Sequence, residues 1–233
     1  RFDDTIDTLA GSQFFSKLDL RSGYWQVEMR EEDKPKTAFS VGNLGFYECE
    51  RMSFGLCNAP ATFQRLMEKC MGDLHLRECL VFIDDILIFS KTFEEHIQRL
   101  EAVFERLSQH NLKLKPSKCE FFKTSVVYLG HLVSSEGVAT DPDKTEAIKS
   151  WQPPSNIKEL RHFLGFAGYY RRFVESFSSI AQPLNALLEG HVTHKGKKKG
   201  KTKKKSKKPT EWVWGTKQQE AFEKLKEKLT SPP

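Results

Sequence analysis

The sequence lacks the features that mark a secreted or membrane-spanning protein. No apolar run approaches the ~20 residues that a membrane span requires, and residues 1–4 show neither an initiating methionine nor a signal-peptide pattern. The five cysteines are odd in number and form no Cys-x-x-Cys pair, which argues against a disulfide framework or a structural zinc site. We therefore expect an intracellular globular protein with reduced thiols, no membrane association, and an origin as a piece of a longer polypeptide.

The net charge of +6 comes from one short segment. Ten lysines lie between residues 195 and 208, and the remaining 27 basic and 31 acidic residues leave a charge of −4. Because this lysine segment holds no apolar residue, we predict a disordered linker over residues 191–210. It could bind nucleic-acid backbone or serve as a nuclear import signal, but a solvated insertion is the simpler interpretation.

The most informative segment is residues 81–89, VFIDDILIF, in which two apolar, β-branched runs flank Asp84 and Asp85. Such runs lack the alternation of half-exposed strands and predict strands buried on both faces. A hairpin turn between them would contain no glycine. Adjacent carboxylates beside a core are costly unless a positive charge compensates them, and a bound Mg²⁺ would supply that charge. The alternative is a solvated two-residue turn.

A third carboxylate, Asp19, follows another short, mainly apolar run at residues 14–18. A single aspartate at a strand end is usually a cap or turn residue. Three carboxylates on two strand ends could instead hold two metal ions about 4 Å apart, which would activate an attacking hydroxyl and stabilise a leaving oxygen in phosphoryl transfer. This interpretation requires Asp19 and Asp84, 65 positions apart in the sequence, to meet in space.

Five segments resemble, in order and spacing, the motifs A to E of reverse transcriptases from gypsy-type LTR retrotransposons. They are residues 16–26 (SKLDLRSGYWQ), 52–64 (MSFGLCNAPATFQ), 82–85 (FIDD), 112–119 (LKLKPSKC) and 128–131 (YLGH). The resemblance covers nearly the whole chain, and it implies a fragment of a pol polyprotein. One such segment alone would be a weak signal, whereas five in register are highly specific.

The resemblance implies that Asp19, Asp84 and Asp85 are the catalytic carboxylates. They would hold two Mg²⁺ ions, or Mn²⁺, with Asp19 and Asp84 as the main ligands. Adjacent side chains of an extended strand point to opposite faces, so Asp84 and Asp85 can share a metal only if the turn reorients one of them.

The resemblance also implies contacts with nucleotide and nucleic acid. Tyr24 would lie under the incoming sugar and reject a 2′-hydroxyl, although an ordinary core aromatic is the alternative. Glycine at position 55 would allow close backbone approach to the nucleotide. The implied deoxynucleotide site comprises Tyr24, Phe54, Gly55 and Lys115, and the implied template–primer contacts are Gln64, Tyr128, Leu129, Gly130, Arg171 and Arg172. For Arg171 and Arg172, a solvated face beside core aromatics is an equal alternative.

The implied fold is α/β (α+β), a right-hand polymerase palm with partial fingers, a helical thumb and the start of the connection to RNase H. Residues 1–133 would form the palm and fingers, and residues 134–190 the thumb and connection helices. Residues 211–233 would begin an RNase H-like region whose catalytic part is absent. Only 18 residues precede Asp19, which is fewer than the family's fingers need, so we expect the fingers to be truncated.

One helix can be placed from its own residues. The segment Thr92-Phe93-Glu94-Glu95 is typical of a capping box. Apolar residues follow at helical spacing and predict a helix that packs against the sheet and stops near residues 110–111. The apolar residues are Ile97, Leu100, Phe104 and Leu107, and we expect His96 and His110 to lie at the surface.

Together these features predict an RNA-directed DNA polymerase that transfers deoxynucleotides onto a primer 3′-hydroxyl. The expected partners are RNA and DNA template–primers, deoxynucleoside triphosphates and other segments of the pol polyprotein, in a cytoplasmic particle, the nucleus or both. Two alternatives stay open. One is an inert retroelement remnant that only binds nucleic acid. The other is a different two-metal enzyme, such as a nucleotide cyclase or a DNA-templated polymerase, against which the pair Phe54-Gly55 argues.

Overall fold

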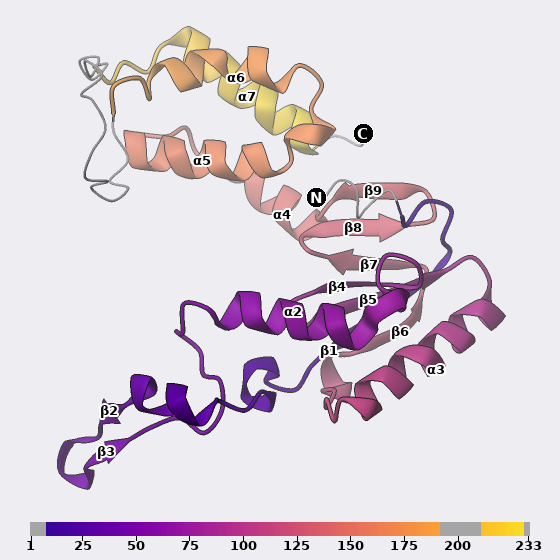
Figure 1. Ribbon diagram of the computed structural model, residues 1–233. Coiled ribbons are helices and arrows are strands. Elements are labelled where there is room, and N and C mark those ends of the chain that lie inside the picture. Colours follow the sequence, from indigo (N-terminus) through magenta and orange to yellow (C-terminus); the bar gives the residue numbers. More distant parts are fainter. Residues whose placement is uncertain (1–7, 192–210, 231–233) are drawn as a thin grey trace, which may run out of the picture. The chain divides into compact units, whose positions relative to one another are not determined.

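The computed structural model describes residues 8–191 and 211–230, and it divides into two compact units, Arg1–Val138 and Ala139–Pro233 (Figure 1). The predicted thumb began after residue 133, five residues before this division. The predicted lysine-rich linker lies almost wholly outside the described residues. Within the described ranges, no helix is long and apolar enough to cross a membrane.

A four-stranded antiparallel sheet forms the centre of the first unit, with the strand order β4-β5-β1-β6. The strands β4 and β5 are the two halves of the predicted hairpin, and both are buried on two faces, as their unbroken apolar runs predict. The strand bounds are Phe14–Asp19 for β1, Cys79–Phe82 for β4, Asp85–Ser90 for β5 and Glu120–Lys123 for β6.

Two helices, α2 (Ala59–Met71) and α3 (Phe93–Gln109), lie against this sheet (Figure 1). Helix α2 begins after Asn58 and has proline in its first turn, where the missing N–H is harmless. Helix α3 begins as predicted, because the Thr92 side chain accepts a hydrogen bond from the Glu95 N–H at 3.2 Å. Both helices share one core with the facing side chains of the sheet.

The buried face of α3 differs from the predicted one. His96 is fully buried, whereas Ile97 and Phe104 are 46% and 39% exposed. The buried positions are His96, Leu100, Val103 and Leu107, which keep helical spacing. The prediction of a surface position for His96 is therefore wrong. Helical spacing favoured the apolar Ile97 as the buried residue, but His96 is buried instead because it forms hydrogen bonds inside the core.

His96 is buried because a chain of hydrogen bonds satisfies both ring nitrogens. The Ser90 hydroxyl donates to the Thr92 carbonyl at 2.8 Å, so its oxygen accepts from His96 Nδ1, 2.9 Å away. Nε2 of the neutral ring then accepts from the Ser16 hydroxyl at 2.7 Å, and the Ser16 oxygen accepts from the Phe122 N–H at 3.1 Å. This network joins α3 to strands β1, β5 and β6, and burial lowers the pKa of His96.

The remaining strands of the described chain form two smaller sheets, the second of which ends at the boundary of the two units. A hairpin of β2 (Phe39–Ser40) and β3 (Phe46–Tyr47) extends from the main sheet (Figure 1). The other sheet has the order β7-β8-β9, and its first two strands meet at a two-residue turn, Leu129-Gly130, with positive φ at both positions. Its strands are β7 (Ser125–Tyr128), β8 (His131–Ser134) and β9 (Gly137–Thr140).

The second unit is mainly helical. Its helices are α4 (Pro142–Lys149), α5 (Ile157–Tyr169), α6 (Phe177–Ala186) and α7 (Thr216–Thr230). Residues of all four helices meet in one core. Helix α7 buries Phe222, Leu225 and Leu229 there, at helical spacing. The segment 211–230 therefore packs with the helices before the linker.

Candidate active site

Two of the three predicted catalytic carboxylates lie on neighbouring strands. Asp19 is the last residue of β1 and Asp85 is the first residue of β5, and the antiparallel register pairs them directly. Paired residues of an antiparallel ladder project from the same face of the sheet, with Cβ atoms about 5 Å apart. Both side chains are partly buried. The sheet thus brings together two residues that are far apart in the sequence.

The third carboxylate, Asp84, lies in the tight turn between β4 and β5. Phe82 pairs with Asp85, so the turn consists of Ile83 and Asp84 alone. Ile83 has a φ of 53°, in the left-handed region that a β-branched residue rarely adopts. The turn predicted without glycine is therefore real, and it carries backbone strain beside the candidate catalytic residues.

Two lysines provide the positive charge that the carboxylates require. Lys17 Nζ lies 3.5 Å from an oxygen of Asp85, and Lys118 Nζ lies 3.3 Å from an oxygen of Asp19. Burial raises the pKa of Asp85; the positive charge of Lys17 opposes this rise, and the negative charges of Asp84 and Asp19 add to it. The three carboxylates therefore interact electrostatically where β1 ends and β5 begins.

The carboxylates have the chemistry of a Mg²⁺ site, since hard carboxylate oxygens are the ligands that Mg²⁺ prefers. Among the described residues, however, no group of three or more His, Cys, Asp or Glu side chains is drawn together closely enough to hold a metal ion. Lysine ammonium groups neutralise Asp19 and Asp85 instead. The two-metal site therefore stays a prediction. The three aspartates have the right chemistry for it and lie near one another at the ends of β1 and β4 and the start of β5.

The residues predicted to bind the nucleotide only partly come together. The rings of Tyr24 and Phe54 lie 5.1 Å apart between centroids, and Phe54 is 68% exposed. Gly55 follows with a φ of 91°, and a Cβ built there would meet no described atom within 4 Å. Lys115 touches the site through its backbone, because its N–H donates to the Asp19 carbonyl at 2.9 Å. Its exposed side chain forms no ion pair within the described part of the chain.

The predicted template–primer residues lie in three different settings. Gln64 on α2 bonds to the backbone of the Ile83 turn. Tyr128 is 2% exposed, and burial raises its pKa, so its ring is closed to nucleic acid and only the Leu129-Gly130 turn is accessible. Arg171 and Arg172 are exposed in the second unit, where Arg172 lies over the Phe173 ring at 5.5 Å. Their contact with nucleic acid stays a prediction.

Two residues beside the carboxylates were not predicted. Lys17 stands two positions before Asp19 on the same strand face, so the period of two in a β-strand could have indicated it. Gly23 belongs to a short 3-10 helix, Gly23–Gln26. A Cβ built on Gly23 would lie 2.9 Å from the Phe63 ring and 3.3 Å from Asp84 Cβ, so the 3-10 helix packs closely against the turn. No signal in the sequence indicates this approach.

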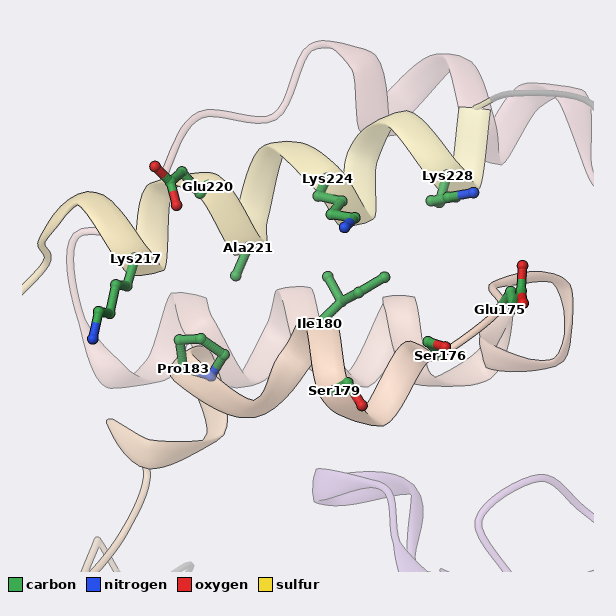
Figure 2. A pocket seen from close by; sticks show the side chains of 10 residues that line it. All are labelled: Glu175, Ser176, Ser179, Ile180, Pro183, Lys217, Glu220, Ala221, Lys224 and Lys228. Atoms are coloured by element: carbon green, nitrogen blue, oxygen red, sulfur yellow. The ribbon is translucent and has the colours of Figure 1, made fainter.

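The second unit contains a hollow of about 530 Å³ between α6 and α7, and Figure 2 shows the side chains that line it. Lys217, Lys224 and Lys228 come from one face of α7, with Ser176 and Ser179 on the α6 side. Its carboxylates, Glu175 and Glu220, come from separate elements and form no cluster that could hold a metal. This hollow therefore contains no grouping comparable to Asp19, Asp84 and Asp85.

Comparison with solved structures identifies the fold. The foamy viral protease–reverse transcriptase in complex with ds DNA matches 97% of this chain and 37% of its own with a TM-score of 0.81 at 22% identity. The structure of a foamy viral protease–reverse transcriptase in complex with RNA/DNA hybrid matches 97% of this chain and 28% of its own with a TM-score of 0.79 at 23% identity. At this identity the likeness concerns the fold, and it confirms the predicted reverse transcriptase architecture.

Sequence relatives identify the family. The retrovirus-related Pol polyprotein from transposon 297 of Drosophila melanogaster is 42% identical over 231 residues, which are 99% of this chain and 20% of the relative. The corresponding polyprotein from transposon gypsy of the same organism is 39% identical over 226 residues, 97% of this chain and 21% of the relative. This chain thus spans about a fifth of the length of these relatives. The family model described as "Reverse transcriptase (RNA-dependent DNA polymerase)" matches residues 2–133, and the chain therefore belongs to the reverse transcriptase family, as its five motifs predict.

Proposed function

We propose that this chain is the polymerase part of a retrotransposon Pol polyprotein and that it adds deoxynucleotides to a primer 3′-hydroxyl under the direction of an RNA template. The observation that carries the proposal is the register that sets Asp19 against Asp85, with Asp84 in the adjoining turn. A shared cluster of carboxylates is what two-metal phosphoryl transfer requires. Both the family and the fold support this reaction over a nucleotide cyclase.

In this proposal Asp19 and Asp84 are the main metal ligands, with help from Asp85. When bound, two Mg²⁺ ions, or Mn²⁺, would lower the pKa of the primer hydroxyl and neutralise charge on the phosphates. The ammonium groups of Lys118 and Lys17 occupy the positions of countercharges beside Asp19 and Asp85. The Lys118 side chain is 56% exposed and the Asp19 side chain 17%, and this ion pair would have to open for Asp19 to act as a metal ligand.

Tyr24 and Phe54 would form the floor of the nucleotide site. The Tyr24 ring contacts two aromatic rings, that of Phe63 at 5.5 Å and that of Phe54 at 5.1 Å between centroids. Steric exclusion of a 2′-hydroxyl requires a side chain that cannot move aside. A ring that packs against two other rings meets this requirement. Lys115 would approach the triphosphate, since its side chain is exposed and its backbone N–H bonds to the Asp19 carbonyl.

The proposed nucleic-acid partners are RNA and DNA template–primers. The related foamy viral enzymes have been solved with ds DNA and with an RNA/DNA hybrid. We propose contacts through the Leu129-Gly130 turn of the first unit and through Arg171 and Arg172 of the second. Phosphate contacts of this kind fix position rather than sequence. The other segments of the polyprotein would supply the remaining functions.

The test is primer extension on matched templates. A DNA primer annealed to RNA and the same primer annealed to DNA are incubated with Mg²⁺ and deoxynucleotides, using this chain and the longer reading frame that encodes it. The proposal expects incorporation directed by the RNA template in at least the longer protein. Binding of the template–primer without incorporation by either protein would contradict the proposal and favour the inert remnant.

A further inference from the structure

We infer that Gln64 is a positioning residue whose side-chain amide holds the turn that carries Asp84, rather than a residue that contacts the template–primer. The inference rests on the proposed function for its catalytic consequence. The contact itself is independent of any reaction. Gln64 lies on α2, one residue after Phe63, on the side of the helix that faces the β4–β5 hairpin.

The amide of Gln64 bonds to the first residue of the turn and to the strand β4 that leads into it. Its Oε1 accepts a hydrogen bond from the Ile83 N–H at 2.7 Å, and its Nε2 donates to the Val81 carbonyl at 3.3 Å. The backbone N–H is always a donor, so the amide orientation is fixed, with oxygen towards Ile83. The hydrogen bond to Ile83 is the shorter of the two and therefore the stronger attachment of Gln64 to the hairpin.

The position of the hairpin explains why this tie is needed. β4 is the outer strand of the sheet, so one side of its backbone has no neighbouring strand to bond with. In the turn, the Ile83 N–H points away from the ladder, and a half-buried donor without an acceptor is costly. Gln64 provides that acceptor and covers the outer edge of β4 next to the turn.

The strain at Ile83 makes the tie important for Asp84. A left-handed isoleucine persists only where the surroundings hold it. The Ile83 side chain packs against the core that includes α2, and Gln64 bonds its backbone. The direction of the Asp84 carboxylate depends on the backbone of the residue before it. Without Gln64 the turn can relax, and the carboxylate moves away from its partners.

The neighbouring residue on α2 supports the same turn from the other side. The Phe63 ring is in close contact with Gly23, which in turn approaches Asp84 Cβ. Phe63 is fully buried. Two successive residues of α2 thus fix the turn, Gln64 through hydrogen bonds to its backbone and Phe63 through the glycine that lies beside Asp84.

The hydrogen-bonding capacity of Gln64 argues against a role on nucleic acid. An amide has two N–H donors. One donates to Val81, and the other donates to Glu68 Oε1 at 2.9 Å. No donor is left for a phosphate or base, and the carboxylate of Glu68 would repel a phosphate placed there. The side chain is therefore already committed within the protein.

The experiment compares three variants with the parent chain. Gln64→Met keeps the length of the side chain and removes every hydrogen bond. Gln64→Glu keeps an acceptor for the Ile83 N–H, and Glu68→Gln is the matched control that changes only the outer partner. For each, backbone amide exchange at Ile83 is measured by NMR, together with kcat, the Mg²⁺ concentration for half-maximal rate, and the Kd for template–primer.

We expect Gln64→Met to speed amide exchange at Ile83 by about tenfold, the factor that one lost hydrogen bond gives. It should lower kcat, raise the Mg²⁺ requirement and leave the Kd for template–primer within about twofold. Gln64→Glu should keep exchange slow, and Glu68→Gln should resemble the parent. A merely structural role would lower the melting temperature without changing the Mg²⁺ requirement.

Two results for Gln64→Met would overturn the inference. One is unchanged amide exchange at Ile83. The other is a higher Kd for template–primer with an unchanged kcat, which would indicate that Gln64 contacts the template–primer. If neither the parent chain nor the longer protein extends a primer, the proposed function fails, while amide exchange at Ile83 still decides whether Gln64 holds the turn. The two failures are therefore distinguishable.

Discussion

Asp19 and Asp85 face each other across the antiparallel pair of β1 and β5, and each has a lysine as its countercharge. The pairing sets two carboxylates on one face of the sheet, where like charges oppose each other unless cations intervene. Lys17, from the same face of β1, partly compensates Asp85, and Lys118 compensates Asp19 from a segment 99 residues further along the chain. This arrangement leads to predictions about charge, packing and selectivity.

Replacing Lys17 with methionine should raise the pKa of Asp85 further. Burial raises this pKa in the parent, and the positive charge of Lys17 opposes the rise. NMR titration of the Asp85 carboxyl in Lys17→Met measures the change, with Lys36→Met as the control because Lys36 pairs with Asp33 instead. An Asp85 pKa that is unchanged or lower in Lys17→Met would show that the ion pair has no electrostatic influence in solution.

The buried His96 should make the first unit lose stability as the pH falls. Its pKa is lowered in the folded state by burial, so the unfolded chain binds more protons between the folded pKa and about 6.5. The free energy of unfolding therefore falls as the pH drops below about 6.5. In His96→Leu the Ser16 and Ser90 hydroxyls lose their partner, which costs about 2 kcal/mol at pH 7.5.

The difference between parent and His96→Leu isolates this histidine, because all other titrating groups are common to both. Urea denaturation followed at the amide signals of β1 should show that the stability difference narrows between about pH 7 and pH 5. A difference that stays constant across this range would contradict the assignment of a neutral, hydrogen-bonded ring.

A methyl group at position 23 should disturb the site. In Gly23→Ala the new Cβ would meet the buried Phe63 ring at 2.9 Å and Asp84 Cβ at 3.3 Å, and such overpacking typically costs about 1–3 kcal/mol. We expect lower stability and a lower kcat. Gly165→Ala is the control, since it lies within α5 with open space around it and should be neutral or slightly stabilising. Equal behaviour of the two variants in thermal melts and extension assays would refute the close contact.

Shortening Tyr24 should weaken the discrimination between deoxynucleotides and ribonucleotides. The ring is held between Phe54 and Phe63, so Tyr24→Val opens space where a 2′-hydroxyl would project. We expect the ratio of kcat/KM for dNTP over rNTP to fall by about 10- to 100-fold, the range that steric selection gives. The control Tyr47→Val alters an exposed ring on the β2–β3 hairpin. A ratio unchanged by Tyr24→Val would indicate that the ring only fills the core.

Local signals in the sequence predicted much of the fold. The start of α3 at Thr92 depends on residues within one helical turn. The unbroken apolar runs around Asp84-Asp85 predicted a buried hairpin for the same reason. Their meeting with Asp19 followed only from the resemblance to a family, because pairing between distant strands leaves no mark in either strand.

What the sequence could not predict depends on partners from distant segments. His96 became a core residue because serines from β1 and β5 bond its ring. Gln64 looked like a template contact because its acceptor role depends on the backbone of a turn 19 residues away. Lys118 meets Asp19 only through the folded sheet. In each case the side chain is polar, and its position is decided by which hydrogen bonds the fold makes available.

The most direct test of the carboxylate site is single-turnover primer extension by Asp19→Asn, with Asp73→Asn as the matched control. Asp73 is an exposed aspartate paired with Arg106 at 2.6 Å, away from the site. We predict that Asp19→Asn lowers the rate by about 10³-fold, because asparagine cannot supply the ligand charge, while template–primer affinity is kept and the control retains the parent rate. Extension by Asp19→Asn at the parent rate would contradict the account.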